Sequence, residues 1–183
     1  MIEISNRKIL VIAAHPDDEI LGCGGSLNKF SNNNCEIHII FMTNGVSSRN
    51  IKNKTNLIAL RQKSAKQCTK LLGVKKNYFL DFPDNKLDSI PLLKIIKKIE
   101  YYISKIKPDH ILTHSEHDLN IDHRLTYQAT LTACRPDIGQ IISLISFEIP
   151  SSTEYSLNSN FKPNLFIDIS EFIINKIKCL NFY

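Results

Sequence analysis

The sequence lacks the features that mark a membrane-spanning, secreted or nucleic-acid-binding protein. No apolar run in its 183 residues approaches the ~20 that a membrane-spanning helix needs. The N-terminus has no charged, apolar and then small pattern, so we predict no signal peptide. No block of basic residues occurs, and the net charge is only +5. We therefore expect no nucleic-acid partner and no membrane span, while an anionic small-molecule substrate remains compatible with the charge.

The cysteines lack any paired pattern. Their number is odd, and no CxxC motif occurs. Without a secretion signal, these features predict reduced, mostly buried thiols in a cytoplasmic protein. The cysteines are Cys23, Cys35, Cys68, Cys134 and Cys179.

Internal repeats, low-complexity linkers and phosphate-binding motifs are also absent. No Walker A sequence occurs, and the glycine-rich stretch 22–25 follows acidic residues instead of joining a strand to a helix. Close helix packing explains these glycines better than a GxGxxG motif. An apolar content of 43% and a charged content of 22% are ordinary globular values. We expect one domain over residues 1–183.

Short apolar runs alternate with amphipathic stretches along the chain. Runs of this length that are apolar on both faces are typical of strands buried under helices on each side. The alternation predicts an α/β fold, a three-layer Rossmann-like sandwich with a mostly parallel sheet. The expected strands are residues 8–14, 36–43, 77–82, 110–114, 141–149 and 164–170, and the expected helices include 55–72, 89–106 and 122–134.

Polar side chains gather where the first predicted strand ends. His15, Asp17 and Asp18 follow it directly, and Pro16 turns the chain between the imidazole and the acids. Neighbouring carboxylates repel one another unless a cation neutralises them, and a divalent metal is the natural neutraliser. His15 and Asp18 could converge on one ion while Asp17 points elsewhere. The alternative interpretation is a set of helix-capping acids beside an incidental histidine.

A second imidazole and carboxylate cluster follows the fourth predicted strand. That strand ends at His114, and the sequence HDLNIDH over residues 117–123 leads to His123, which opens a helix. The carboxyl ends of parallel strands meet at one edge of the sheet, where ligands bind. Two histidines and one carboxylate with an open position make a catalytic zinc arrangement. One alternative is that the two clusters are unrelated polar loops. Another is an aspartyl-phosphate enzyme, which also has an acidic pair after its first strand, but it would leave the second cluster unexplained.

At these residues the sequence resembles the LmbE/PIG-L family of zinc-dependent N-acetyl sugar deacetylases. The resemblance extends from the first predicted strand to the end of the chain. It rests on AHPDDE at 14–19, TNG at 43–45, Arg61 ahead of LGV at 72–74, FPD at 82–84 and above all DLNIDHR at 118–124.

The resemblance implies one zinc ion per chain, with His15, Asp18 and His123 as its ligands. It also implies that Asp17 is the general base. Asp122 fits a role in orienting a neighbouring polar group, as carboxylates around metal sites do.

One position departs from the family pattern. Many members carry HxDH, whose first histidine helps to polarise the acetyl carbonyl, and here Asn120 occupies that place. An amide can donate a hydrogen bond to an oxyanion but supplies no positive charge. Either Asn120 takes this catalytic role, or His117 or His114 does, or activity is weaker. Members also continue for some dozens of residues further, so the chain is either truncated or naturally short, and a missing segment would remove part of the substrate cleft.

Four side chains are candidates for substrate binding. The resemblance places Arg61 at the rim of the active site, and Arg135 could likewise reach the cleft, where an arginine would clamp a phosphate or nucleotide. Asn44 could bond a sugar hydroxyl, and Asp84 could accept one. The alternatives are a solvated helix face for Arg135, as for Arg124, and plain turns for Asn44 and Asp84.

These features predict a zinc-dependent N-deacetylase, a hydrolase of linear amide bonds, that acts on an N-acetylated sugar or sugar conjugate. That substrate would be a glycan, a cell-surface polysaccharide or a glycolipid precursor, and the enzyme could form a homo-oligomer. The alternatives are a zinc amidohydrolase acting on a non-sugar acylated amine or thiol conjugate, and a non-catalytic sugar- or nucleotide-binding module. A carboxylate that is not a zinc ligand, such as Asp17, argues against a non-catalytic binding module, because a structural zinc site needs no general base.

Overall fold

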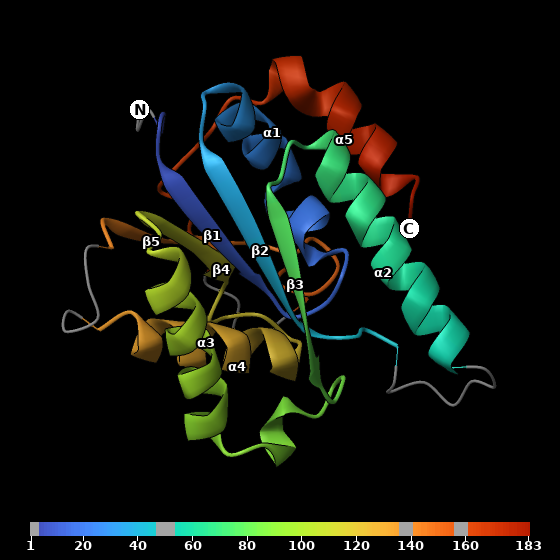
Figure 1. The fold of residues 1–183 in the computed structure, drawn as a ribbon, viewed down its shortest axis with the longest axis vertical. Helices are drawn as coiled ribbons and strands as arrows, with labels where there is room; N and C mark the ends of the chain where they lie inside the picture. Colours follow the sequence, from blue (N-terminus) through green and yellow to red (C-terminus); the bar gives the residue numbers. More distant parts are fainter. Residues whose placement is uncertain (1–3, 47–53, 136–140, 156–160) are drawn as a thin grey trace.

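The computed structural model describes residues 4–46, 54–135, 141–155 and 161–183. Five strands form one sheet, and helices cover both of its faces (Figure 1). In chain order the elements are β1 (Lys8–Ala13), the π-helical turn η1 (Glu19–Cys23), α1 (Gly24–Asn32), β2 (Glu36–Thr43), α2 (Lys54–Leu71), β3 (Lys76–Phe82), the 3₁₀ turn η2 (Leu87–Ser89), α3 (Leu92–Ile106), β4 (His110–His114), α4 (Ile121–Ala133), β5 (Ser143–Phe147), the 3₁₀ turn η4 (Ser170–Phe172) and α5 (Ile173–Leu180).

The sheet is wholly parallel, with the strand order β3-β2-β1-β4-β5. The central strand β1 pairs with β2 and β4, so that Val11 lies between Ile39 and Leu112. The chain moves outward from β1 to β3 and then crosses back to β4 on the other side of β1. This reversal sets the carboxyl ends of β1 and β4 side by side at the position where open α/β sheets bind ligands. The predicted three-layer α/β architecture is confirmed.

The two faces of β1 explain the two helix layers. Successive side chains of a strand point to opposite faces, and here both faces are fully buried. Ile9 and Val11 join the core beneath α1, α2 and α5, whereas Leu10 and Ile12 join the core beneath α3 and α4 (Figure 1). Burial on both sides accounts for the continuous apolar run in the sequence.

The glycine-rich stretch at the start of α1 allows close packing, as expected. A β-carbon added to Gly22 would lie 2.3 Å from the ring of Phe147, and one added to Gly25 would lie 2.5 Å from Ile169. Both distances are far shorter than real contacts, so glycine at these positions permits the close approach of η1 to β5 and of α1 to the segment before η4.

The sixth predicted strand is wrong. Residues 164–170 form no strand, and η4 begins at Ser170. Leu165, Ile167 and Ile169 are nevertheless partly buried, while the residues between them are exposed. The alternating pattern therefore marks a segment with one side against the protein, here near Gly25 of α1. An alternating apolar pattern indicates that one side of a segment is buried, and such burial does not require a hydrogen-bonded neighbouring strand.

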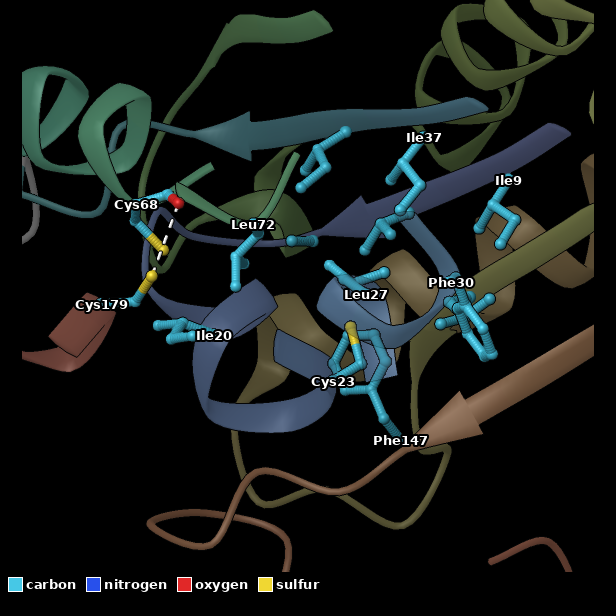
Figure 2. Packing of buried hydrophobic residues seen from close by; sticks show 14 of the residues in the cluster. Ile9, Ile20, Cys23, Leu27, Phe30, Ile37, Cys68, Leu72, Phe147 and Cys179 are labelled. Atoms are coloured by element: carbon cyan, nitrogen blue, oxygen red, sulfur yellow. Dashed lines mark hydrogen bonds between the residues drawn. The ribbon is translucent and has the colours of Figure 1, made fainter. Parts of the chain in front are cut away.

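Two further observations concern the cysteines and membrane spans. All five cysteines are free, and four are buried, in agreement with the prediction of reduced thiols. Figure 2 shows Cys23, Cys68 and Cys179 packed among aliphatic side chains of the core. Within the described residues, no helix combines the length and the apolar character needed to cross a membrane.

Two leucines, one buried and one exposed, test the core beneath α1, α2 and α5. Leu27 of α1 is fully buried in it (Figure 2), whereas Leu93 of α3 is 64% exposed. We expect Leu27→Ala to lower the free energy of unfolding by about 2–5 kcal/mol, because it leaves a cavity. The matched change Leu93→Ala should cost about 0.5 kcal/mol or less. Urea unfolding of both variants checks this, and equal losses would contradict the assigned core.

Candidate metal centre and active site

Three potential metal ligands from two distant parts of the chain meet at the carboxyl edge of the sheet. The loop after β1 supplies His15 and Asp18, and the first turn of α4 supplies His123. His15 Nδ1 lies 3.1 Å from His123 Nε2 and 3.2 Å from Asp18 Oδ2, and His123 Nε2 lies 3.3 Å from the same oxygen. All three residues are buried. Their donor atoms thus form a small triangle that one cation could contact.

The opposite nitrogen of each imidazole faces a carboxylate. His15 Nε2 lies 3.2 Å from Asp122 Oδ2 and 3.3 Å from Asp84 Oδ1. His123 Nδ1 lies 3.1 Å from Asp118 Oδ1. Metal-binding histidines in proteins characteristically have such carboxylate partners, which fix the ring orientation and make the ligand nitrogen more basic.

The charges of the cluster favour a cation. Burial alone would raise the pKa of the Asp18 carboxyl, but the imidazoles of His123, His114 and His15 hold it well below its usual range. Burial alone would lower the pKa values of the two triangle imidazoles, yet the Asp18 charge raises that of His123 to about 9 and that of His15 well above its ordinary value. The carboxylates therefore attract positive charge between the rings, which is the electrostatic condition for a divalent ion.

Asp17 stands apart from the triangle. Its carboxylate oxygen Oδ2 accepts a hydrogen bond from Arg61 Nη2 at 2.5 Å. Burial, followed by the Asp18 charge, raises the pKa of Asp17 to about 6, and the Arg61 charge opposes this shift. A carboxylate with a raised pKa beside a metal site, yet outside the ligand set, suits proton transfer near neutral pH.

Asp122 is fully buried beneath the cluster. Besides facing His15, it accepts hydrogen bonds from the backbone N–H groups of Asn85 at 2.7 Å and Leu87 at 3.0 Å. The residue therefore ties the loop after β3 to the start of α4. Its orienting role toward a neighbouring polar group stays a prediction, for which His15 is the neighbour that the structure offers.

The three alternatives for carbonyl polarisation lie in different places. Asn120 caps α4, since its Oδ1 accepts from the Asp122 N–H at 2.8 Å, and its side chain lines the cleft above the triangle. His114 is fully buried behind the triangle, where its ring stacks on that of His123 with 4.0 Å between centroids. His117 lines a different groove beside β5. Only Asn120 faces the cleft.

The predicted substrate residues separate into two groups. Arg61 and Asp84 line the cleft. Asn44 bonds within its own turn, where its Oδ1 accepts from the Val46 N–H at 3.0 Å, and it does not line the cleft. Arg135 is exposed just beyond the last residue of α4, whereas His123 lies in the first turn of that helix, so the structure does not bring Arg135 to the site.

The cleft itself has a volume of about 290 Å³. All three residues of the triangle line it, as do Asp17 and Arg61. Most other lining groups are hydroxyls and amides, and two aliphatic residues complete the wall. These lining residues are Leu21, Asn85, Asn120, Ile149, Ser151 and Ser152.

Asp118 is a further carboxylate of the site whose contacts the sequence did not reveal. Besides facing His123, its carboxylate accepts hydrogen bonds from the Ser152 hydroxyl at 2.9 Å and the Thr153 hydroxyl at 2.7 Å. It also accepts from the Asn120 N–H at 2.8 Å. Asp118 thus ties the turn after β5 to His123. Its place inside the DLNIDH motif was a usable signal, whereas nothing in the sequence marked Ser152 or Thr153.

Glu19 was also missed. It is fully buried, and burial raises the pKa of its carboxyl to about 7. Its Oε2 accepts the backbone N–H of Asp17 at 2.9 Å. A buried glutamate directly after two aspartates was visible in the sequence, but its partners were not.

Fold and site together define an α/β protein whose buried imidazoles and carboxylates could hold a metal ion at the switch point of a parallel sheet. The chain belongs to the PIG-L family, described as GlcNAc-PI de-N-acetylase, whose model matches residues 10–134. That match contains every member of the triangle.

Characterised and uncharacterised deacetylases are similar to this chain. An uncharacterised deacetylase, YaiS, of Escherichia coli (strain K12) is 30% identical over 178 residues, which cover 93% of this chain and 88% of that protein. The diacetylchitobiose deacetylase of Thermococcus kodakarensis is 27% identical over 184 residues, which cover 95% of this chain and 68% of that protein. The solved N,N'-diacetylchitobiose deacetylase from Pyrococcus horikoshii superposes with a TM-score of 0.75 at 25% identity, covering 98% of this chain and 72% of that one.

Removing Asp118 tests the connection beneath the site. We expect Asp118→Ala to lower the free energy of unfolding by about 2–3 kcal/mol, because buried donors from several elements lose their acceptor. Asp88→Ala provides a control, since Asp88 is exposed in η2, and it should change stability by about 0.5 kcal/mol or less. Thermal and urea unfolding of both variants measure the difference. Equal stability of the two variants would contradict the assigned role.

Proposed function

We propose that this chain is a zinc-dependent deacetylase that hydrolyses the acetamide of an N-acetylated sugar or sugar conjugate. The observation that carries the proposal is the triangle of His15, Asp18 and His123, with the carboxylate of Asp17 outside the triangle in the same cleft. Membership of a deacetylase family and the similarity to two diacetylchitobiose deacetylases support it.

The donor set fits zinc. Two imidazole nitrogens and one carboxylate oxygen are ligands that zinc uses in catalytic sites, where a fourth position stays open to solvent. The described part of the chain offers no cysteine in this cluster, and a structural site would normally be rich in thiolates. When bound there, zinc would supply a Lewis acid that lowers the pKa of a water molecule toward ~7 and polarises the acyl carbonyl.

The side chains around the triangle have distinct tasks in this proposal. Asp17 takes a proton from the attacking water and then delivers it to the departing amine nitrogen, for which its raised pKa suits it. Asn120 donates its amide N–H to the acetyl oxygen as negative charge develops there. Arg61 holds the Asp17 carboxylate at the cleft and contacts the substrate from the rim.

The cleft walls favour a substrate rich in hydroxyl groups. Side-chain amides of Asn85 and Asn120 and hydroxyls of Ser151 and Ser152 line it, and its volume is about 290 Å³. Such a space suits a single sugar ring with its acetamide directed at the triangle, while the carrier of that ring extends outside. Asp84, although it lines the cleft, faces His15 at 3.3 Å, so we assign it to the support of that ring.

The roles of Asp17 and the triangle are tested with the purified chain and zinc. We expect Asp17→Asn to keep its zinc and to lose acetate release by about 10²–10⁴-fold, because only the proton acceptor is removed. His123→Ala should lose the zinc itself. Zinc analysis and acetate detection measure both, with N-acetylglucosamine, diacetylchitobiose and UDP-N-acetylglucosamine as sugar substrates and an N-acetylated cysteine conjugate as the non-sugar alternative.

A histidine outside the site provides the matched control. His117 lies in the second groove, and its one ion-pair partner within the described residues is Glu116 at 3.6 Å. His117→Ala should therefore keep both zinc and turnover. Zinc-free wild type, or full turnover in Asp17→Asn, would overturn the proposal. Turnover of the cysteine conjugate alone would move the substrate class away from sugars.

Asn120 is tested separately, with its capping role preserved. Serine is as good an N-cap as asparagine but has no amide N–H to give to the acetyl oxygen. We expect Asn120→Ser to fold with wild-type stability and to lower kcat by about 10²-fold, the size of loss found for one oxyanion donor. Steady-state kinetics and thermal unfolding together give the result. Unchanged kcat would assign polarisation to another group.

A further inference from the structure

Tyr183, which follows α5, reaches back to the loop after β1. Its hydroxyl donates a hydrogen bond to Glu19 Oε1 at 2.6 Å. The other carboxylate oxygen of Glu19 accepts the backbone N–H of Asp17 at 2.9 Å. Two hydrogen bonds through a fully buried glutamate therefore connect the phenol to the main chain of Asp17.

A second path connects Tyr183 to the side chain of Asp17. The Arg61 guanidinium lies over the Tyr183 ring, with 5.6 Å between Cζ and the ring centroid. The same guanidinium donates to Asp17 Oδ2. A cation over an aromatic ring is attracted by its π-electron face, so the ring helps to fix the arginine.

Asp17 has a backbone conformation that needs such support. Its φ is 131°, a value that residues with a β-carbon rarely adopt. Strained residues of this kind persist only where the surroundings over-determine them, and they are concentrated at functional sites. Glu19 fixes the Asp17 amide, and this fixes the direction in which its carboxylate leaves the main chain.

Hydrogen bonds anchor α5 and the residues that follow it to neighbouring elements, which holds Tyr183 in place. Ser64 of α2 donates its hydroxyl to the Phe182 carbonyl at 2.5 Å. The Cys179 thiol donates to the Cys68 carbonyl of α2 at 3.5 Å (Figure 2), and Lys176 Nζ donates to the Leu21 carbonyl of η1 at 3.1 Å. The helix is thus joined to both α2, which carries Arg61, and η1, which begins at Glu19.

We infer that Tyr183 is a positioning residue for Asp17, acting on its main chain through Glu19 and on its carboxylate through Arg61. The inference rests on the proposed function in one respect only, namely that Asp17 is the base. The positions of the groups stand without it, so the test combines a structural readout with a kinetic one.

The structural readout is hydrogen exchange of the Asp17 backbone amide, followed by NMR on the full chain. Tyr183→Phe removes the hydroxyl and keeps the ring over Arg61. We expect the Asp17 amide to exchange about tenfold faster, because Glu19 loses the donor that holds it. The Lys107 amide, which bonds to Ile103 in α3, should be unchanged. Tyr101→Phe is the matched control, since Tyr101 lies 52% exposed on α3.

The kinetic readout separates positioning from folding. We expect Tyr183→Phe to lower kcat about tenfold while KM and zinc content stay near wild type, because the base is misplaced in a chain that is still folded at the assay temperature. Tyr183→Ala removes the ring as well and should lower kcat by about 10²-fold. In a Glu19→Gln background, Tyr183→Phe should cost less than about twofold more, as residues that act through one another are not additive.

The results of these experiments distinguish the positioning role of Tyr183, its path through Glu19 and the proposed function. An unchanged Asp17 amide in Tyr183→Phe overturns the inference whatever the activity. Additive losses in the double variant overturn the path through Glu19. A wild type without deacetylase activity, but with an Asp17 amide that depends on Tyr183, overturns the proposed function and leaves the positioning role in place.

Discussion

The arrangement depends on one electrostatic constraint: several carboxylates are buried around two imidazoles at the end of a parallel sheet. Removing such groups from water is costly unless each finds a partner. Here the two rings partner Asp18 on their inner sides and Asp84, Asp122 and Asp118 on their outer sides. The inner side of the cluster keeps room for a positive charge, and a divalent cation supplies it in the most compact form.

The fold places these groups through its connectivity. A chain reversal between β3 and β4 puts the loop after β1 next to the first turn of α4, although His15 and His123 are 108 positions apart in the sequence. The loops after β3 and β5 then close around them. Asp122 binds two backbone N–H groups of the first loop, and Asp118 binds two hydroxyls of the second. The same carboxylates that orient the rings therefore hold the walls of the cleft.

Activity and specificity occupy different parts of this arrangement. In the proposed function the triangle and Asp17 carry out amide hydrolysis, a chemistry that many acetamides share. The amides and hydroxyls that also line the cleft, with Arg61, would contact the sugar ring. Relatives of this fold can therefore share the floor and differ in substrate, because only the outer cleft distinguishes one acetamide from another.

Local sequence determined much of this protein. The apolar runs specified all five strands, of which β1, β2 and β4 are buried almost throughout and the edge strands β3 and β5 only in part. The motif residues His15, Asp18 and His123 indicated a metal, because like charges at one sheet edge need a cation. Only the tertiary structure decided that residues 164–170 do not join the sheet and that Asn44 and Arg135 do not line the cleft. It alone also showed which groups Asp118, Glu19 and Tyr183 contact. Those outcomes depend on hydrogen-bond partners far away along the chain, and a local pattern carries no record of which distant group satisfies a buried donor or acceptor.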